Sequence, residues 1–281
     1  MSVDAVQLEL FRHLLVSIAE EMGVTLRKSS YSANIKERRD YSCAVYDRRG
    51  ETVAMGDHMP VHLGAMPLSV RAAMEAFELQ EGDVALVNDP FQGGTHLPDI
   101  TAVAPVFAGA GRPAFYVAAR AHHSDVGGMS PGSMPMAREI YQEGLRIPPI
   151  LIQRRGVLDQ PLLNLILANV RTPVERQGDL AAQLAAIARG AQRLQQLVAK
   201  YGLPRVEEGM RGLQDYSARM MTSALRGLPT GTYRFEDALD SDGVISTPVP
   251  IRVAITIRAG RAVVDFTGSS VQVAGPMNAN Y

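Results

Sequence analysis

Five of the six histidines in this chain lie between positions 58 and 123, close in sequence to several aspartates. Most of them fall in two segments, residues 88–99 and residues 120–128, and the second segment contains an adjacent histidine pair. Imidazoles and carboxylates gathered among glycines are the groups that a hydrolytic metal site uses. The clustering therefore indicates a site rather than an effect of composition.

His96 and Asp99 are three residues apart across a proline, a spacing that can bring an imidazole and a carboxylate to one ion. His122 would complete a set of two histidines and one carboxylate, which leaves open positions for water and substrate. Nitrogen and oxygen ligands without a thiolate suit Mn²⁺, Fe²⁺ or Zn²⁺. The alternative is that His96 and Asp99 form a hydrogen-bonded pair and that the histidine dyad caps a strand end.

His122 and His123 are adjacent, so in a continuous strand their side chains point to opposite faces. Only one of them can then share a pocket with Asp99. A free carboxylate or imidazole beside the ion could orient or deprotonate water, which makes Asp125 and His123 the candidate catalytic residues. The alternative for Asp125 is that it caps the turn into Gly127.

Two further groups are candidates for substrate binding. Gly93 and Gly94 permit either close backbone approach to a ligand or a turn with positive φ. His58 and His62 form a second polar element, although taken alone this pattern favours a loop whose histidines are satisfied within the protein. The chain has no G-x-x-x-x-G-K-[S/T] sequence, so it carries no recognisable nucleotide site of its own.

The pattern of elements predicts an α+β fold: a mixed sheet in a strand-rich N-terminal half, a helical middle segment and returning antiparallel strands. We expect residues 1–160 to form a metal-site α/β region. Residues 161–281 should form a helical segment followed by antiparallel strands, unless the two make one continuous domain. A first helix should run from Val6 to Met22 and end at Gly23, and a capping box at Thr172 should start a helix that reaches Tyr201. The remaining expected elements are a hairpin at 43–46 and 51–54, a helix at 64–77, strands at 84–87, 100–107 and 114–119, a loop at 127–137, a helix at 206–225, and strands at 231–238, 249–258 and 262–267.

Composition narrows the possible functions. The chain has 281 residues, 46% hydrophobic and 20% charged, which is ordinary for a globular protein. A net charge of −1 implies no broad attraction to nucleic acid or to an anionic membrane. The single cysteine, Cys43, lies in an apolar run and should be a buried structural thiol. With no signal peptide and no membrane span apparent, the sequence predicts a cytoplasmic protein without nucleic-acid or membrane partners.

Several long motifs, in order along the chain, resemble the hydantoinase B family. They are residues 32–44, 58–66, 88–99, 121–128 and 143–149. The family comprises the B subunits of ATP-dependent N-methylhydantoinases, the C-terminal part of 5-oxoprolinases and the alpha subunits of acetone carboxylase-type enzymes. Residues 121–133 resemble the hydantoinase branch more than the carboxylase branch. Family members are usually longer, so the resemblance implies the N-terminal half of a larger family fold.

The resemblance also implies a mechanism. A hydantoinase A-like partner uses ATP to phosphorylate the carbonyl oxygen of a small cyclic imide or lactam. The hydantoinase B-like chain then supports attack of water on the activated carbon, and the ring opens with release of phosphate. The chain would thus be one subunit of a hetero-oligomeric hydrolase that acts on C–N bonds in cyclic amides.

In the carboxylase branch of the family, Mn²⁺ is held by a His-x-x-Asp pair and a later histidine. Carried over to this sequence, these ligands are His96, Asp99 and His122, and Mn²⁺ is favoured over Fe²⁺ or Zn²⁺. Two alternatives stay open beside the hydrolase. One is an alpha-type subunit of an ATP-dependent ketone carboxylase, and the other is an inactive scaffold for the A-type subunit.

Overall fold

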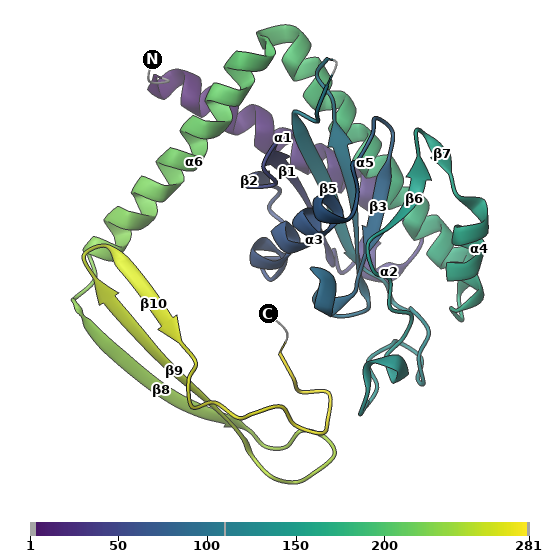
Figure 1. Cartoon of the computed structure of the whole chain (residues 1–281), viewed down its shortest axis with the longest axis vertical. Coiled ribbons are helices and arrows are strands. Elements are labelled where there is room, and N and C mark those ends of the chain that lie inside the picture. Colours follow the sequence, from purple (N-terminus) through teal and green to yellow (C-terminus); the bar gives the residue numbers. More distant parts are fainter. Residues whose placement is uncertain (1–3, 110, 280–281) are drawn as a thin grey trace.

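A computed structural model describes residues 4–109 and 111–279, which form two antiparallel sheets with helices (Figure 1). The larger sheet has seven strands in the order β2-β1-β5-β4-β3-β6-β7, and the smaller has the order β10-β9-β8. The α+β class is confirmed. Every strand pair in the described residues is antiparallel, so the large sheet is not mixed. The strands are β1 (Tyr41–Asp47), β2 (Thr52–Met55), β3 (Val84–Val87), β4 (Asp99–Val106), β5 (Phe115–His122), β6 (Ile150–Arg154), β7 (Val157–Leu158), β8 (Gly231–Leu239), β9 (Val249–Arg258) and β10 (Arg261–Asp265).

The first helix is longer than its sequence pattern predicts. Helix α1 spans Ala5–Ser29 and continues through Gly23, which was expected to end it. A side chain at position 23 would collide with the imidazole of His58 and the ring of Tyr41. Gly23 therefore serves close packing of the helix against the β1–β2 region rather than helix termination.

Helices cover both faces of the large sheet. Helices α1 and α5 (Pro173–Tyr201) pack on one face, and α3 (His62–Ala76) packs on the other. Because side chains alternate along a strand, neighbouring residues enter different cores. Cys43 and Ala119 are buried on the α1/α5 side, whereas Ala44 and Ala118 pack with α3. The prediction that Cys43 is a buried thiol is confirmed.

Helix α5 begins and ends where the sequence predicts, but the capping box does not form. Thr172 makes no side-chain cap bond, and its hydroxyl accepts instead from the Arg176 guanidinium. Helix α5 lies beyond residue 160, yet it packs along α1 and against β4 and β5. The division at residue 160 stays a prediction. The sequence pattern missed β6, β7, the four-residue helix α2 (Ala33–Lys36), the 3₁₀ turns η1 (Pro90–Gln92) and η2 (Ile140–Gln142), and α4 (Gln160–Ala168).

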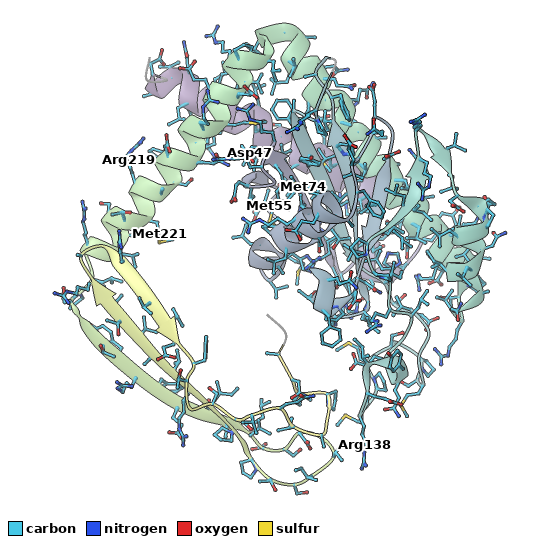
Figure 2. The ribbon with its side chains drawn as sticks, in the orientation of Figure 1. Asp47, Met55, Met74, Arg138, Arg219 and Met221 are labelled. Atoms are coloured by element: carbon cyan, nitrogen blue, oxygen red, sulfur yellow. The ribbon has the colours of Figure 1, made fainter. Side chains whose placement is uncertain are left out.

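Helix α6 (Leu203–Arg226) leads away from the packed body to the three-stranded sheet (Figure 1). Figure 2 shows Arg219 and Met221 on the part of α6 that projects from the body, and both side chains are exposed. The last hairpin turns at Ala259 and Gly260, both with positive φ, between the strands predicted at 249–258 and 262–267. No helix among the described residues has both the length and the hydropathy needed to cross a membrane.

Candidate metal centre

The strand pairing brings together three of the residues that the sequence singles out. Asp99 begins β4 and pairs with His122, the last residue of β5, while His96 lies in the turn that precedes β4. His96 Nε2 is 3.0 Å from Asp99 Oδ1, and His122 Nδ1 is 3.1 Å from the same oxygen. One ligand atom from each of the three residues lies within 4.8 Å of the others.

The second carboxylate oxygen of Asp99 also has polar neighbours. His62 Nε2, from the start of α3, is 3.3 Å from Asp99 Oδ2, and the Thr95 hydroxyl donates to that oxygen at 3.3 Å. The other nitrogen of His62 is 2.9 Å from the Ser42 hydroxyl, which fixes the ring. Asp99 is thus contacted through both oxygens by three imidazoles and one hydroxyl.

The charge of this carboxylate is strongly favoured. Burial by itself would raise the pKa of Asp99, but hydrogen bonds from His122, His62 and His96 outweigh burial and hold that pKa well below its usual range. For His96, burial acts to lower the pKa, while the hydrogen bond to Asp99 and its charge raise it, and the net result is a raised pKa. Asp99 is therefore an anion at neutral pH, as a metal ligand must be.

A buried guanidinium lies behind the carboxylate. Arg120, fully buried two residues before His122 in β5, donates to the hydroxyls of Thr101 at 2.8 Å and Ser69 at 2.9 Å. It also reaches the Thr95 hydroxyl at 3.4 Å, and that hydroxyl contacts Asp99. Burial lowers the pKa of Arg120, and the negative charge of Asp99 opposes this shift. The cation and Asp99 therefore stabilise each other through one hydroxyl.

The donor set fits a divalent metal ion. Two imidazole nitrogens and a carboxylate oxygen lie about as far apart as ligands that share an ion at roughly 2.0–2.2 Å. The side chain of His96 is 39% exposed, so the cluster can be reached from solvent at that edge. Asp40, itself partly exposed, places Oδ2 4.0 Å from His122 Nδ1. The cluster therefore has a buried side at Asp99 and an accessible side at His96 and Asp40.

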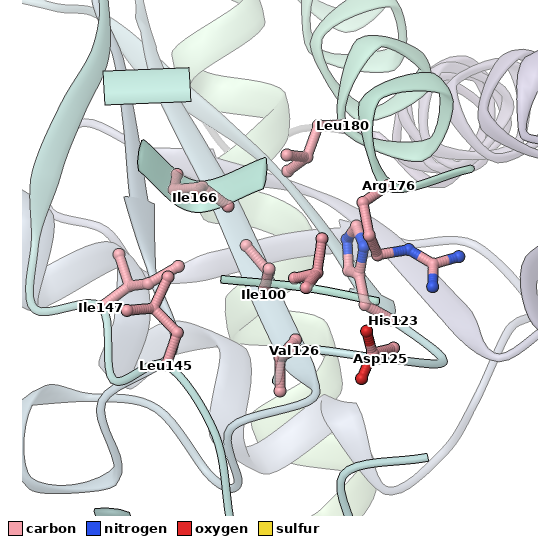
Figure 3. Close-up of a pocket in the computed structure, with 10 residues that line it drawn as sticks. Ile100, His123, Asp125, Val126, Leu145, Ile147, Ile166, Arg176 and Leu180 are labelled. Carbon is pink, nitrogen blue, oxygen red and sulfur yellow. The ribbon is translucent and has the colours of Figure 1, made fainter. Parts of the chain in front are cut away.

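The structure does not join His123 and Asp125 to this cluster. His123 Nε2 is 2.8 Å from Gln183 Oε1 on α5, and the ring is fully buried. The Asp125 carboxylate pairs with the Arg171 guanidinium at 3.0 Å and accepts from the Gly127 backbone N–H at 3.3 Å. Both residues line a small pocket that is otherwise largely apolar, with Arg176 beside them (Figure 3). Asp125 thus makes the turn contact that was the alternative to a catalytic role.

The four candidate substrate-binding residues have different surroundings. Gly93 has φ of 88°, and a side chain there would come within 2.5 Å of the Leu68 carbonyl oxygen. A side chain at Gly94 would collide with the backbone of Asn88. Gly93 therefore fits the turn with positive φ, whereas Gly94 admits close approach of the protein's own backbone without a positive φ.

The two histidines of the second polar element separate. His58 Nδ1 accepts from the Cys43 N–H at 3.2 Å, and its ring packs between Gly23, Gly56 and the Tyr41 ring. Its contacts are those of a satisfied core histidine. His62 instead belongs to the surroundings of Asp99.

Sequence reasoning missed several residues around the cluster. Arg120 and Thr101 could have been found from the sequence. Arg120 is two residues before His122 in one strand and Thr101 is two residues after Asp99 in another, so each lies on the same face of the sheet as that residue. Ser69 and Gln183 could not have been found in this way, since only the packing of α3 and α5 on the sheet brings them near.

The chain is similar in sequence to a known protein family and to several of its members. A sequence profile of the hydantoinase B/oxoprolinase family matches residues 4–281. The 5-oxoprolinase of Saccharomyces cerevisiae is 37% identical over 298 residues, which cover 99% of this chain and 23% of that protein. A Pseudomonas sp. protein named as the putative B-type component of a D-/L-hydantoinase is 34% identical over 283 residues, covering 96% of this chain and 48% of the relative.

Among solved structures, that of an ATP-dependent caprolactamase from Pseudomonas jessenii superimposes with a TM-score of 0.90 at 33% sequence identity. The match covers 100% of this chain and 48% of the caprolactamase chain. The chain therefore spans about half the length of the hydantoinase and caprolactamase chains that it matches, and about a quarter of the yeast enzyme.

Proposed function

Because the chain belongs to the hydantoinase B/oxoprolinase family, we propose that it forms part of an ATP-dependent hydrolase that opens small cyclic amides. Hydantoin-type and 5-oxoproline-type rings are the substrate class that its relatives' names suggest. One observation carries the proposal that hydrolysis occurs on this chain. Two imidazoles, His96 and His122, converge on one oxygen of the buried carboxylate Asp99.

In this proposal His96, Asp99 and His122 hold a divalent ion, with Mn²⁺ favoured over Fe²⁺ or Zn²⁺. Such an ion, when bound, lowers the pKa of water and polarises a substrate oxygen. His62 and Thr95 hold the second oxygen of Asp99 and so keep the carboxylate in one orientation.

We further propose that Asp40 accepts a proton from the attacking water, since its carboxylate is partly exposed and lies next to His122. The sequence alone favours Asp125 or His123 for this role. Asp125 is occupied by Arg171 and His123 by Gln183, so Asp40 is the better placed candidate.

The ATP-dependent step is assigned to a hydantoinase A-like partner that phosphorylates the carbonyl oxygen of the ring. The relative named as a B-type hydantoinase component supports such a hetero-oligomer. Water then attacks the activated carbon, and the ring C–N bond breaks as the nitrogen takes up a proton, which leaves an acyl phosphate. A second water hydrolyses this acyl phosphate to a carboxylate and free phosphate. The intact cluster argues against an inactive scaffold, and bicarbonate-independent turnover would argue against a ketone carboxylase.

The proposal is tested by metal content and ring opening together. Purified chain, reconstituted separately with Mn²⁺, Fe²⁺ and Zn²⁺, should hold about one ion, whereas His96→Ala should hold much less. His13→Ala, which removes an exposed histidine of α1, is the matched control and should keep the ion. With an A-type partner and ATP, wild type should open 5-oxoproline or hydantoin and His96→Ala should not. Equal metal content in wild type and His96→Ala, or none in either, would refute the metal centre.

A further inference from the structure

A glutamine lies directly behind the metal cluster, on the opposite side of the sheet. Gln183 projects from α5 and is fully buried. Its amide nitrogen donates to the backbone carbonyls of Ile100 at 2.9 Å and Ala119 at 3.0 Å. Its amide oxygen is 2.8 Å from His123 Nε2. One side chain thus makes three hydrogen bonds to two neighbouring strands.

These contacts fix how the glutamine and the histidine are oriented. A carbonyl oxygen can only accept, so the two backbone carbonyls require the NH₂ group of Gln183 to face them. The amide oxygen must then face His123, whose Nε2 therefore carries the hydrogen. All hydrogen-bonding groups of the Gln183 side chain are thereby used within the core.

Two of the three bonded positions adjoin the proposed ligands. Ile100 follows Asp99 in β4, and His123 follows His122 at the end of β5. Adjacent Cα atoms are a fixed ~3.8 Å apart, so holding Ile100 and His123 also limits where Asp99 and His122 can move. Because side chains alternate, the ligands face α3 while the residues bonded to Gln183 face α5.

We propose that Gln183 is a positioning residue of the metal centre, which ties the ends of β4 and β5 together so that Asp99 and His122 stay in ligating distance. This inference rests on the proposed function, because it assumes that His96, Asp99 and His122 hold an ion. What it adds is that Gln183, which does not contact the ion, controls how tightly the chain binds it. A purely structural role for Gln183 would affect unfolding but leave affinity unchanged.

The test is the affinity of the full 281-residue chain for Mn²⁺, measured by calorimetry well below the unfolding temperature. Gln183→Leu should raise the Mn²⁺ dissociation constant by about 10-fold or more, the range known for residues that support ligands. It should also change the electron paramagnetic resonance spectrum of Mn²⁺ at saturation, because the ligand geometry is altered. Gln183→Met, which has a similar length and no hydrogen-bonding amide, serves if Gln183→Leu fails to fold.

Two controls separate positioning from stability. Gln177→Leu removes an exposed glutamine of the same helix and should leave both affinity and spectrum unchanged. Leu194→Ala removes a fully buried side chain of α5 and should lower the melting temperature while the Mn²⁺ affinity stays at the wild-type value. If wild type binds no Mn²⁺, the proposed function and this inference both fail. If wild type binds Mn²⁺ and the Gln183 variants match it in affinity and spectrum, the inference alone is overturned.

Discussion

His122 and His123 are neighbours in sequence, but they belong to opposite faces of the large sheet. His122 faces α3, where its imidazole contacts the anionic Asp99 and lies near Asp40. His123 faces α5, where it is fully buried and where, among the described residues, its ring hydrogen-bonds only to the neutral amide of Gln183. Two identical side chains are thus placed in different electrostatic environments by the alternation of a single strand.

The two faces use polar groups differently. On the α3 face the imidazoles of His62, His96 and His122 meet at one carboxylate, so the donors converge on a shared charge. On the α5 face Gln183 binds His123 and two backbone carbonyls, so the polar groups of the glutamine are satisfied locally, whereas His123 Nδ1 has no hydrogen-bond partner in the part of the chain that the structure describes. Polar groups that converge on one partly accessible charge are typical of a ligand site, whereas fully buried groups that pair with near neighbours are typical of a core.

The largest expected loss of metal affinity and ring opening follows from substitution of Asp99, on the α3 face. Asp99→Asn keeps the shape of the side chain but removes the charge that three imidazoles contact. We expect metal affinity to fall by more than the ~10–100-fold typical of supporting residues, and ring opening to fall with it. Elemental analysis and the coupled assay measure both. Asp83→Asn, a buried aspartate that binds the backbone of Gln80 and Arg155, is the control and should retain metal.

The next largest effects should differ between the adjacent histidines, with loss of metal at His122 and loss of stability at His123. His122→Ala should remove the ion, with only a modest change in unfolding free energy, because its ring is partly exposed. His123→Phe should leave the Gln183 amide oxygen unpaired in the core, and should lower the unfolding free energy by roughly 1–3 kcal/mol. Denaturant unfolding and metal titration of both variants check this. If His123→Phe loses the ion as completely as His122→Ala, the assignment of metal binding to the α3 face alone is wrong.

Much of this arrangement follows from the sequence, for physical reasons that apply residue by residue. Strand alternation correctly places only one member of the histidine pair beside Asp99, and the His-x-x-Asp spacing brings His96 to the same carboxylate. By contrast, Gly23 looks like a helix end because glycine has low helix propensity. Its actual role depends on His58, which is 35 positions away in the chain and contacts it only after folding.

The same limit applies to the surroundings of the site. Gln183 lies 60 residues from its partner His123, and Arg171 lies 46 residues from Asp125. Local periodicity carries no information about such contacts. The sequence could therefore supply the proposed ligands, but not the residues that orient them or that pair with Asp125 and His123.

A smaller effect is expected at Asp125. Its carboxylate is paired with Arg171 and holds the turn at Gly127, so Asp125→Asn and Arg171→Leu should weaken the same contact. We expect both variants to lose about 1–3 kcal/mol of unfolding free energy and to keep the ion. Parallel unfolding curves and metal contents would support this. A drop in ring opening of ~10²-fold or more in Asp125→Asn, with Arg171→Leu near wild type, would instead identify Asp125 as the general base.

The smallest expected effect is the response of the isolated chain to ATP. Carboxylates occupy the starts of several helices: Asp4 caps α1, Asp159 caps α4, and Glu175 lies in the first turn of α5. A phosphate group would be repelled there, since helix N-termini bind anions only when their N–H groups and positive dipole are free. Calorimetry of the chain with ATP, without divalent ions so that the metal centre cannot recruit the nucleotide, should show no measurable heat. Adding a hydantoinase A-like partner with Mg²⁺ should restore nucleotide binding. Tight ATP binding by the chain alone would mean that one face of the molecule carries a phosphate site that neither strand alternation nor helix capping reveals.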